Sequence, residues 1–259
     1  MSFSPEEVER YARHLVLSEV GGPGQQRLKA ATVVLVGAGG VGSPAALYLA
    51  AAGVGALRII DGDTVSLSNL QRQILFNTAD IDRPKVEAAA GRLEAINPHV
   101  RVETLNHRLT AENAASVIAG ADVVLDGADD FETRYRVNAA CVAAGVPLVS
   151  GALGRWTGQV GVFAGKPCYR CLVPETPPDA DTCARVGVVG ALAGVIGAMA
   201  ALEAIKLITG AGEPLTGRLL LYDGLAATSR TVKVTADPGC PVCGHPPPSG
   251  EVARSGFAT

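Results

Sequence analysis

The chain has 259 residues and a mass of 26.4 kDa, with 31 glycines and only 4% aromatic residues. Hydrophobic residues make up 48% and charged residues 18%, which excludes disorder over most of the chain. Six cysteines are too few for a disulfide scaffold. A net charge of −3 excludes binding to nucleic acid by bulk charge, so any bound anion must be met by local groups.

Two stretches without charged residues, 30–57 and 186–202, could suggest membrane spans. The first contains a glycine cluster and Pro44, which an unbroken helix does not tolerate. The second is short for a span, and Glu203 and Lys206 continue the same helix. We therefore expect two buried core elements and no membrane span. The N-terminal sequence lacks the basic and then apolar pattern of a signal peptide, so we expect a cytoplasmic protein.

The first part of the chain alternates predicted helices and strands. Ser4-Pro5-Glu6-Glu7 resembles a capping box and predicts a helix to about residue 17, which Gly21–Gly24 should end. β-Branched apolar runs then alternate with helical segments, which predicts a doubly wound, mostly parallel α/β sheet of the Rossmann-like type. Predicted strands lie at 32–36, 56–60, 101–105, 122–125 and 147–150, and predicted helices at 42–52, 84–96, 111–118 and 133–144.

After Ser150 the pattern changes to one that predicts an antiparallel extension of the sheet. We expect a strand at 159–163, a loop at 168–184, a helix of small residues at 189–207 and an antiparallel pair at 218–222 and 231–235. The expected division is a nucleotide-binding half at 1–150, an extension at 151–244 within the same integrated domain, and a flexible tail at 245–259.

A glycine turn follows the first predicted strand. Gly37, Gly39, Gly40 and Gly42 lie between this strand and a helix, and Asp61 ends the next strand. Such glycines let phosphate approach backbone N–H groups at a helix N-terminus, and the acidic residue suits a ribose hydroxyl. The turn predicts a nucleotide site but leaves NAD, FAD, S-adenosylmethionine and ATP open. The alternative is a turn required only for packing the helix on the sheet.

Two basic residues follow closely, Arg72 in the string Ser68-Asn69-Leu70-Gln71-Arg72-Gln73 and then Lys85. A triphosphate needs such donors, whereas a dinucleotide has little use for them just after the ribose-binding acid. The Walker pattern GxxxxGK[ST] is absent, so ATP would bind in another mode. Alone, the two cations could simply be solvated surface charges.

The segment Asp126-Gly127-Ala128-Asp129-Asp130 ends another predicted strand, at the sheet edge where ligands bind. Asp129 is a candidate ligand of Mg²⁺, since Mg²⁺ usually bridges one or two carboxylates and substrate phosphates. The alternative is that Asp129 or Asp130 caps the helix that follows.

Two C-x-x-C pairs, Cys168 with Cys171 and Cys240 with Cys243, predict a tetrahedral Zn²⁺ site. With no further ligand candidate nearby, the site should be structural; disulfides are the alternative, which a reducing compartment disfavours. Cys141 belongs to an apolar helix and should be core. Cys183, in a polar loop near Arg185, is a candidate reactive thiol.

Together these residues resemble the MoeB/ThiF family, the bacterial relatives of ubiquitin-activating enzymes. The likeness runs from about residue 5 to residue 244. It rests on R-Y-A-R near the start, G-A-G-G-V-G, D-G-D-T-V-S-L-S-N-L-Q-R-Q, P-K-V-E, D-G-A-D-D, C-Y-R-C, E-A-I-K and C-P-V-C-G.

The resemblance implies a homodimer that uses MgATP to adenylate the C-terminal Gly-Gly carboxylate of a ubiquitin-like sulfur carrier protein. Arg13 resembles the family arginine that reaches the partner subunit's ATP, and Cys183 matches a loop cysteine that links covalently to the carrier in some members. The expected catalytic residues are therefore Arg13, Arg72, Lys85, Asp129 and Cys183. Expected nucleotide contacts are Gly37, Gly39, Gly40, Gly42, Asp61, Asp63, Ser68, Asn69, Leu70, Gln71, Arg72, Lys85, Asp129 and Asp130.

Two departures qualify the resemblance. Asp130 stands where asparagine is common, which adds charge near the expected metal. The chain ends without the rhodanese domain of some relatives, so a separate rhodanese or cysteine desulfurase is expected to donate sulfur. The carrier could serve molybdopterin, thiamine or cysteine synthesis.

Two other functions remain open at this point. An NAD(P)-dependent oxidoreductase accounts for the glycine turn and Asp61 but leaves Arg72, Lys85 and the four cysteines idle. A non-catalytic nucleotide-binding partner of a ubiquitin-like protein conflicts with the presence of Arg13, Arg72, Lys85 and Asp129.

Overall fold

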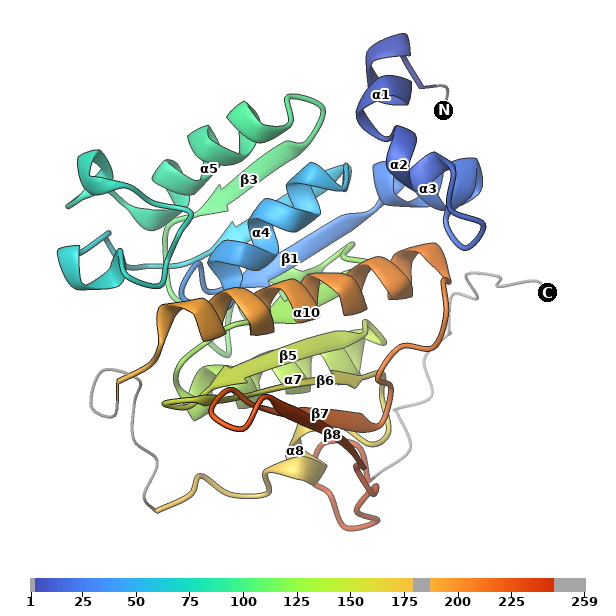
Figure 1. The fold of residues 1–259 in the computed structure, drawn as a ribbon. Coiled ribbons are helices and arrows are strands. Elements are labelled where there is room, and N and C mark those ends of the chain that lie inside the picture. The colour runs from blue at the N-terminus through green and yellow to red at the C-terminus, as the bar shows by residue number, and fades with distance from the viewer. Residues whose placement is uncertain (1–2, 179–186, 245–259) are drawn as a thin grey trace.

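The computed structural model describes residues 3–178 and 187–244, which form a layered α/β fold around one sheet (Figure 1). Within these residues the sheet has eight strands in the order β3-β2-β1-β4-β5-β6-β7-β8. The sheet therefore passes without interruption from the predicted nucleotide-binding half into the predicted extension.

Five strands form the parallel part, as the sequence predicts: β1 pairs with β2 and β4, β2 with β3, and β4 with β5. Successive side chains of β1 enter opposite cores, Val33 and Leu35 on one face and Val34 and Val36 on the other. Helices cover both faces, which is why the strand is a continuous apolar run. The bounds are β1 (Thr32–Val36), β2 (Ala56–Ile60), β3 (Arg101–Leu105), β4 (Val123–Asp126) and β5 (Leu148–Leu153).

The remaining strands are antiparallel: β6 (Thr157–Phe163), β7 (Arg218–Asp223) and β8 (Thr228–Lys233). The predicted last strand, 231–235, is wrong by about three residues at its start. Its six residues are all exposed, so the buried-face alternation that fixes a strand's limits is lacking there.

Helices cover the two faces unequally. The larger core lies beneath α4, α5 and α10, and the second core lies beneath α6 and α7 on the other face (Figure 1). The bounds are α4 (Gly42–Ala51), α5 (Lys85–Ile96), α6 (Ala114–Ile118), α7 (Phe131–Ala144) and α10 (Gly190–Thr209). Short turns of 3₁₀ helix lie at η1 (Leu67–Asn69) and η2 (Thr78–Asp80).

Helix α10 has the length and apolarity of a membrane span, the one such helix among the described residues. It crosses the sheet against β5, β6 and α4, and half of its most apolar window is buried. Its small residues allow this close packing, since a Cβ added at Gly197 would lie 2.3 Å from the Pro44 side chain. The structure therefore shows α10 as a core helix.

The N-terminal segment differs from the prediction of one helix ended by glycines. Tyr11 interrupts it, giving α1 (Pro5–Arg10) and α2 (Ala12–Leu15), although the predicted capping box at Ser4 is present. Gly21–Gly24 begin a further helix, α3 (Gly21–Ala30), instead of a loop. The error arose because a glycine run resembles a helix end, whereas a proline in the first turn is compatible with a helix.

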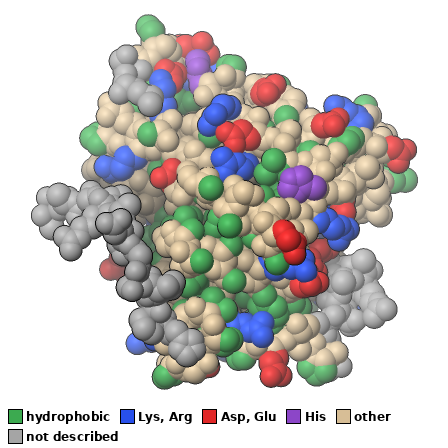
Figure 2. Space-filling view, turned by 180° about the vertical axis from the view of Figure 1, so that it is seen from behind, with side chains coloured by type: hydrophobic (Ala, Val, Ile, Leu, Met, Phe, Trp, Pro, Cys, Tyr) green, Lys and Arg blue, Asp and Glu red, His purple; other side chains and the backbone are tan. Residues whose placement is uncertain are grey.

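One more helix was not predicted. The short α8 (Tyr169–Leu172) lies inside the predicted 168–184 loop; it begins directly after Cys168 and contains Cys171. The surface view from behind shows acidic and basic side chains interspersed, without an extended region of one sign (Figure 2).

The glycine turn after β1 depends on missing side chains. Gly37 has φ +89°, and a Cβ at Gly42 would lie 1.9 Å from the Gly37 carbonyl oxygen. Gly127, after β4, also approaches this turn, since its Cβ would lie 3.1 Å from the Gly42 nitrogen. These contacts bring the ends of β1 and β4 together where the strand order reverses, which is where doubly wound sheets bind ligands.

We predict that Gly42→Ala destabilises the protein by roughly 1–3 kcal/mol, because the added methyl group must displace backbone. Urea denaturation would measure the change. The matched control is Gly91→Ala on α5, where an added Cβ meets nothing within 4 Å. That change should stabilise the chain by about 0.5–1 kcal/mol, and equal effects of the two variants would contradict the prediction.

Candidate active site

A cavity of about 190 Å³ lies at the carboxyl ends of β1, β2 and β4. The glycine turn forms one wall, and residues after the other two strands supply carboxylates. The lining is Gly37, Gly39, Gly40, Val41, Asp61, Asp63, Arg72, Gln73, Lys85, Gly127, Ala128, Asp129, Phe131, Arg134, Gly151, Ala152 and Leu153.

Asp61 shapes the turn as well as lining the cavity. Its Oδ2 accepts a hydrogen bond from the Ala38 N–H at 2.9 Å, and its Oδ1 accepts one from the Asp63 N–H at 2.9 Å. A carboxylate has about four lone-pair sites, so two remain for a ligand's hydroxyl groups.

Lys85 is buried at the start of α5, with Nζ 3.0 Å from Asp63 Oδ2 and 3.7 Å from Asp61 Oδ2. Arg108 contacts Asp63 from the solvent side at 3.1 Å. Partial burial favours the neutral Asp63, but the hydrogen bonds and charges of Lys85 and Arg108 outweigh it and lower the pKa of this carboxyl. The group is therefore an anion at neutral pH and holds the lysine toward the cavity.

The string 68–73 forms a loop whose local bonds aim two side chains inward. Arg72 donates from Nη1 to the Ser68 carbonyl oxygen at 3.0 Å, and Asn69 Oδ1 accepts from the Ser66 N–H. Arg72 and Gln73 line the cavity, whereas Ser68, Asn69, Leu70 and Gln71 lie outside its lining.

Gln73 offers a hydrogen-bond acceptor that a ligand could use. It is only 4% exposed, and its Oε1 is buried without a hydrogen-bond partner among the described residues. A buried acceptor without a partner is costly, so a ligand group that donates a hydrogen bond would fit here. With the glycine wall and the cations, this atom fits a nucleotide.

The two neighbouring aspartates after β4 have different surroundings. Asp130 caps α7, since its Oδ1 accepts from the Thr133 N–H at 2.8 Å. Asp129 is exposed at the cavity and accepts no hydrogen bond from any described residue. The predicted capping role thus falls to Asp130, and Asp129 remains available to a metal ion.

A buried ion pair supports this segment. Arg134 Nη1 lies 3.2 Å from Asp126 Oδ2 and 3.0 Å from Ser150 Oγ, and Nη2 donates to the Gly151 carbonyl oxygen at 2.9 Å. Burial raises the pKa of Asp126, although Arg134, the Ala128 N–H and Ser150 oppose the rise. The pair fixes the ends of β4 and β5 against each other.

The charges of the lining balance: Asp61, Asp63 and Asp129 face Arg72, Lys85 and Arg134. The charge of Arg134 is already neutralised by its ion pair with Asp126. A triphosphate would therefore need a divalent cation and at least one more basic group from outside this lining.

A second, open cavity of about 740 Å³ adjoins the first and shares Ala152 and Leu153 with it. It runs over β6, β7 and β8. The rest of its lining is Gly154, Thr157, Gly158, Gln159, Leu221, Tyr222, Asp223, Thr228, Ser229 and Arg230.

The four paired cysteines come together as predicted. Cys168, Cys171, Cys240 and Cys243 have Sγ atoms that all lie within 4.8 Å of one another. The Cys168–Cys240 and Cys171–Cys243 separations are 3.7 and 3.4 Å, too long for disulfides and close to the edge of about 3.8 Å of a Zn–S₄ tetrahedron. The donor set fits zinc.

The surroundings of these thiols favour deprotonation at one corner. Burial opposes ionisation of Cys240, but hydrogen bonds from the backbone N–H groups of Cys243 and Val242 outweigh it and lower the pKa of this thiol to about 7. Cys141 differs, since burial raises its pKa to about 12, as the predicted core position requires. Cys183 lies outside the described residues.

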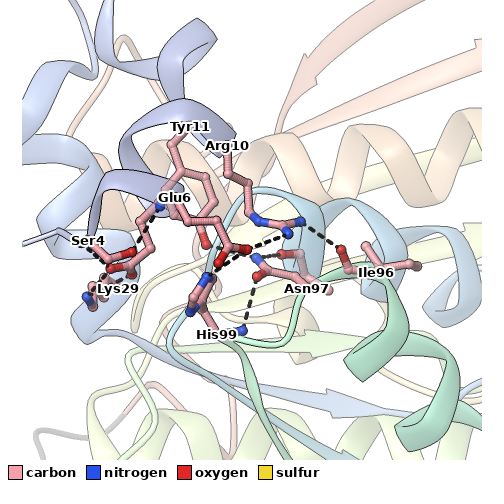
Figure 3. A network of polar contacts seen from close by, with 10 residues as sticks. Ser4, Glu6, Arg10, Tyr11, Lys29, Ile96, Asn97 and His99 are labelled. Carbon is pink, nitrogen blue, oxygen red and sulfur yellow. Dashed lines mark hydrogen bonds and ion pairs between the residues drawn. The ribbon is translucent and has the colours of Figure 1, made fainter.

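Arg13 is exposed on α2 and lies far from its own chain's cavity. The N-terminal helices gather at the start of β1, whereas the cavity lies at the strand's other end (Figure 1). A network of polar contacts attaches α1 and α2 to the ends of α4 and α5 (Figure 3).

Sequence reasoning missed several lining residues, notably Gln73, Phe131 and Arg134. Gln73 belongs to the quoted string but has no distinguishing pattern. Arg134 could have been suspected, since an arginine in the first turn of a helix that follows two carboxylates can reach back to the strand end. Residues 151–153 form the carboxyl end of β5, next to β4, where no local motif points to the cavity.

The fold and cavity define a doubly wound nucleotide-binding protein with a cysteine cluster attached to its antiparallel extension. Residues 11–242 match the ThiF family, and the chain belongs to it.

Three curated relatives match over nearly their whole length. The chain is 48% identical to the "Sulfur carrier protein adenylyltransferase" of Thermus thermophilus, over 97% of this chain and 96% of that protein. It is 46% identical to the "SAMP-activating enzyme E1" of Haloferax volcanii, over 95% and 92%. It is also 46% identical to the "Molybdopterin-synthase adenylyltransferase" of Escherichia coli, over 93% and 98%.

Solved structures show the same fold. PaaA is 26% identical with a TM-score of 0.78, covering 90% of this chain and 75% of that one. E. coli MccB, crystallised with succinimide, is 26% identical with a TM-score of 0.79, covering 91% and 74%.

We predict that the purified protein holds about one zinc ion per chain and that Cys240→Ser loses it, with a fall in melting temperature. Structural zinc contributes directly to folding. Elemental analysis and thermal denaturation would measure both. Cys141→Ala is the matched control and should retain the metal; zinc retention by Cys240→Ser would contradict the assignment.

Proposed function

We propose that this protein is an adenylyltransferase that uses MgATP to activate the C-terminal glycine carboxylate of a ubiquitin-like sulfur carrier protein. The observation that carries the proposal is the convergence of the glycine turn, Asp61, Arg72, Lys85 and Asp129 on one cavity in a ThiF-family chain. The names of two relatives support it: the one from Thermus is an adenylyltransferase of a sulfur carrier protein, and the one from E. coli is a molybdopterin-synthase adenylyltransferase.

The reaction needs no general base from the protein. The carrier's carboxylate is already an anion near pH 7. Its oxygen attacks the α-phosphorus in line, the bond to the bridging oxygen breaks, and pyrophosphate leaves. Catalysis then consists of positioning the reactants and stabilising charge on the phosphates.

Each cavity residue takes a role in this scheme. Asp61 binds the ribose through its free lone pairs, while the glycine turn receives phosphate. Arg72 and Lys85 neutralise the phosphates, and Lys85 is held for this by Asp63. Asp129 would hold Mg²⁺, which supplies positive charge to the leaving pyrophosphate when bound. Loss of one such contact commonly costs about 10²–10³ in rate.

The additional cation comes from a second copy of the chain. Helix α4 begins at the glycine turn and runs about 15 Å to the end where α2 is attached. Arg13 therefore cannot reach its own chain's cavity. Exposed apolar side chains near it, Val8, Val16 and Leu17, with Leu202 on α10, support a homodimer in which Arg13 completes the partner's site.

The carrier's extended C-terminal tail would enter through the second cavity, which leads into the nucleotide cavity at Ala152 and Leu153. Exposed Trp156 and Leu225 lie beside this route and offer apolar contacts to the carrier's folded part. The carrier could belong to molybdopterin, thiamine or cysteine synthesis, and the name of the E. coli relative favours the first.

The sulfur itself would come from a separate donor, a rhodanese or a cysteine desulfurase. Every cysteine among the described residues is accounted for, since Cys141 is buried and the other four form the cluster. A covalent link between the carrier and Cys183 remains a prediction, as does a cytoplasmic location.

We predict that Asp129→Ala lowers carrier-dependent ATP–pyrophosphate exchange by at least 10²-fold, because the metal-bound phosphates lose their anchor. Exchange of labelled pyrophosphate with a Gly-Gly carrier would measure this. Glu94→Ala, which removes an exposed carboxylate on α5, is the control. Full exchange in Asp129→Ala would rule out this site.

We also predict that the cavity binds ATP in the presence of Mg²⁺ and does not bind NADH. The lining offers Arg72 and Lys85 for a triphosphate, which a dinucleotide does not need. Isothermal titration with each ligand distinguishes the two, and Lys85→Met should weaken ATP binding about tenfold or more. Tight binding of NADH would favour an oxidoreductase instead.

A further inference from the structure

The helix that carries Arg13 cannot hold its own position. Helix α2 has four residues, and such a short helix is unstable alone in water. Arg13 itself makes no hydrogen bond or ion pair with residues 3–178 or 187–244. Whatever places this arginine must therefore act through its neighbours.

On one side of Arg13 the anchor is Tyr11, whose hydroxyl accepts a hydrogen bond from Asn97 Nδ2 at 2.8 Å. The same amide group donates to the Ala50 carbonyl oxygen at 2.8 Å, and Asn97 is fully buried (Figure 3). Arg10 adds a bond to the Ile96 carbonyl oxygen at 3.0 Å. The anchor thus joins α2 to the ends of both α4 and α5.

The Tyr11 ring packs against Gly53, where any larger side chain would collide with it. A Cβ at Gly53 would lie 2.5 Å from Tyr11 Cζ, and Gly53 has φ +81°. Tyr11 is 4% exposed. A fixed ring of this kind leaves α2 little freedom to move.

On the other side of Arg13, His14 Nδ1 lies 2.9 Å from Gln25 Oε1, and Gln25 Nε2 donates to the Ala52 carbonyl oxygen at 2.8 Å. Gln25 is fully buried. The amide oxygen can only accept, so His14 donates from Nδ1. Both anchors therefore end on backbone carbonyls two residues apart, at the end of α4.

We propose that the pairs Tyr11–Asn97 and His14–Gln25 are positioning pairs, which hold Arg13 at a fixed place relative to α4 so that it reaches the phosphates in the second copy's cavity. The inference rests on the proposed function. We call residues 11–14, which carry Arg13, the arm. Helix α4 begins at the glycine turn of its own chain's cavity and ends where the arm is attached. This one helix therefore sets the distance between a chain's own cavity and the arm that it extends to the second copy.

The test compares the double variant Tyr11→Phe/His14→Ala with the wild type in carrier-dependent exchange. We expect kcat to fall about tenfold, since two hydrogen bonds of about threefold each are lost, while KM for ATP changes less than twofold. Thermal denaturation would confirm that the variant is folded at the assay temperature. Tyr48→Phe, an exposed tyrosine on α4, is the control and should keep full kcat.

Mixed dimers separate positioning from general stability. Two differently tagged chains are co-expressed, and dimers that carry both tags are purified. Paired with Asp129→Ala, which retains an intact arm, the double variant should regain half of the wild-type activity. In the reverse pairing, the wild type is combined with a chain that carries both the double change and Asp129→Ala. Only the wild-type site can then react, and it meets the misplaced arginine, so the dimer should retain about one-twentieth of the wild-type activity.

The outcomes distinguish the two levels of the proposal. If Arg13→Ala is not rescued by Asp129→Ala in a mixed dimer, the arm does not act between copies and that part of the proposed function fails. If Arg13→Ala is rescued but the double variant keeps full kcat, or is not rescued, the positioning pairs are refuted while the proposed function stands.

Discussion

The buried ion pair of Asp126 and Arg134 is the interaction on which the ligand-binding edge depends. It joins the ends of β4 and β5 and shapes the turn that presents Asp129. Its arginine also lies 5.9 Å from the ring centroid of Tyr169, inside the first cysteine pair. Removing one partner of such a pair typically costs 3–5 kcal/mol, because a buried charge is left alone. The nucleotide cavity and the cysteine cluster therefore share one rigid support.

Much of this architecture follows from sequence patterns with a direct physical cause. The apolar runs at Thr32–Val36 and Ala56–Ile60 predict buried parallel strands because both faces of the sheet are covered. The glycine turn, the carboxylates at strand ends and the two C-x-x-C pairs likewise carry their chemistry in spacing alone. The structure brings Asp61, Arg72, Lys85 and Asp129 to one cavity, as these patterns require.

What the sequence could not provide depends on contacts between distant segments. Gly21–Gly24 begin a helix because α3 packs against α10, a contact that no local signal contains. The division of labour between Asp129 and Asp130 depends on which side chain turns toward the helix start. Gln73 becomes notable only when burial leaves its Oε1 without a partner. The reason for the R-Y-A-R motif also appears only in three dimensions, where Tyr11 fits against Gly53.

The cysteine cluster has a consequence for the unfolded chain. Cys168 and Cys240 are 72 positions apart, so their meeting closes a long loop that contains α10, β7 and β8. Closing such a loop costs about 4 kcal/mol of chain entropy. A metal ion that stayed on the four sulfurs during unfolding would keep the loop closed. The disordered chain would then have fewer conformations to gain, and the antiparallel extension would refold from a partly assembled state.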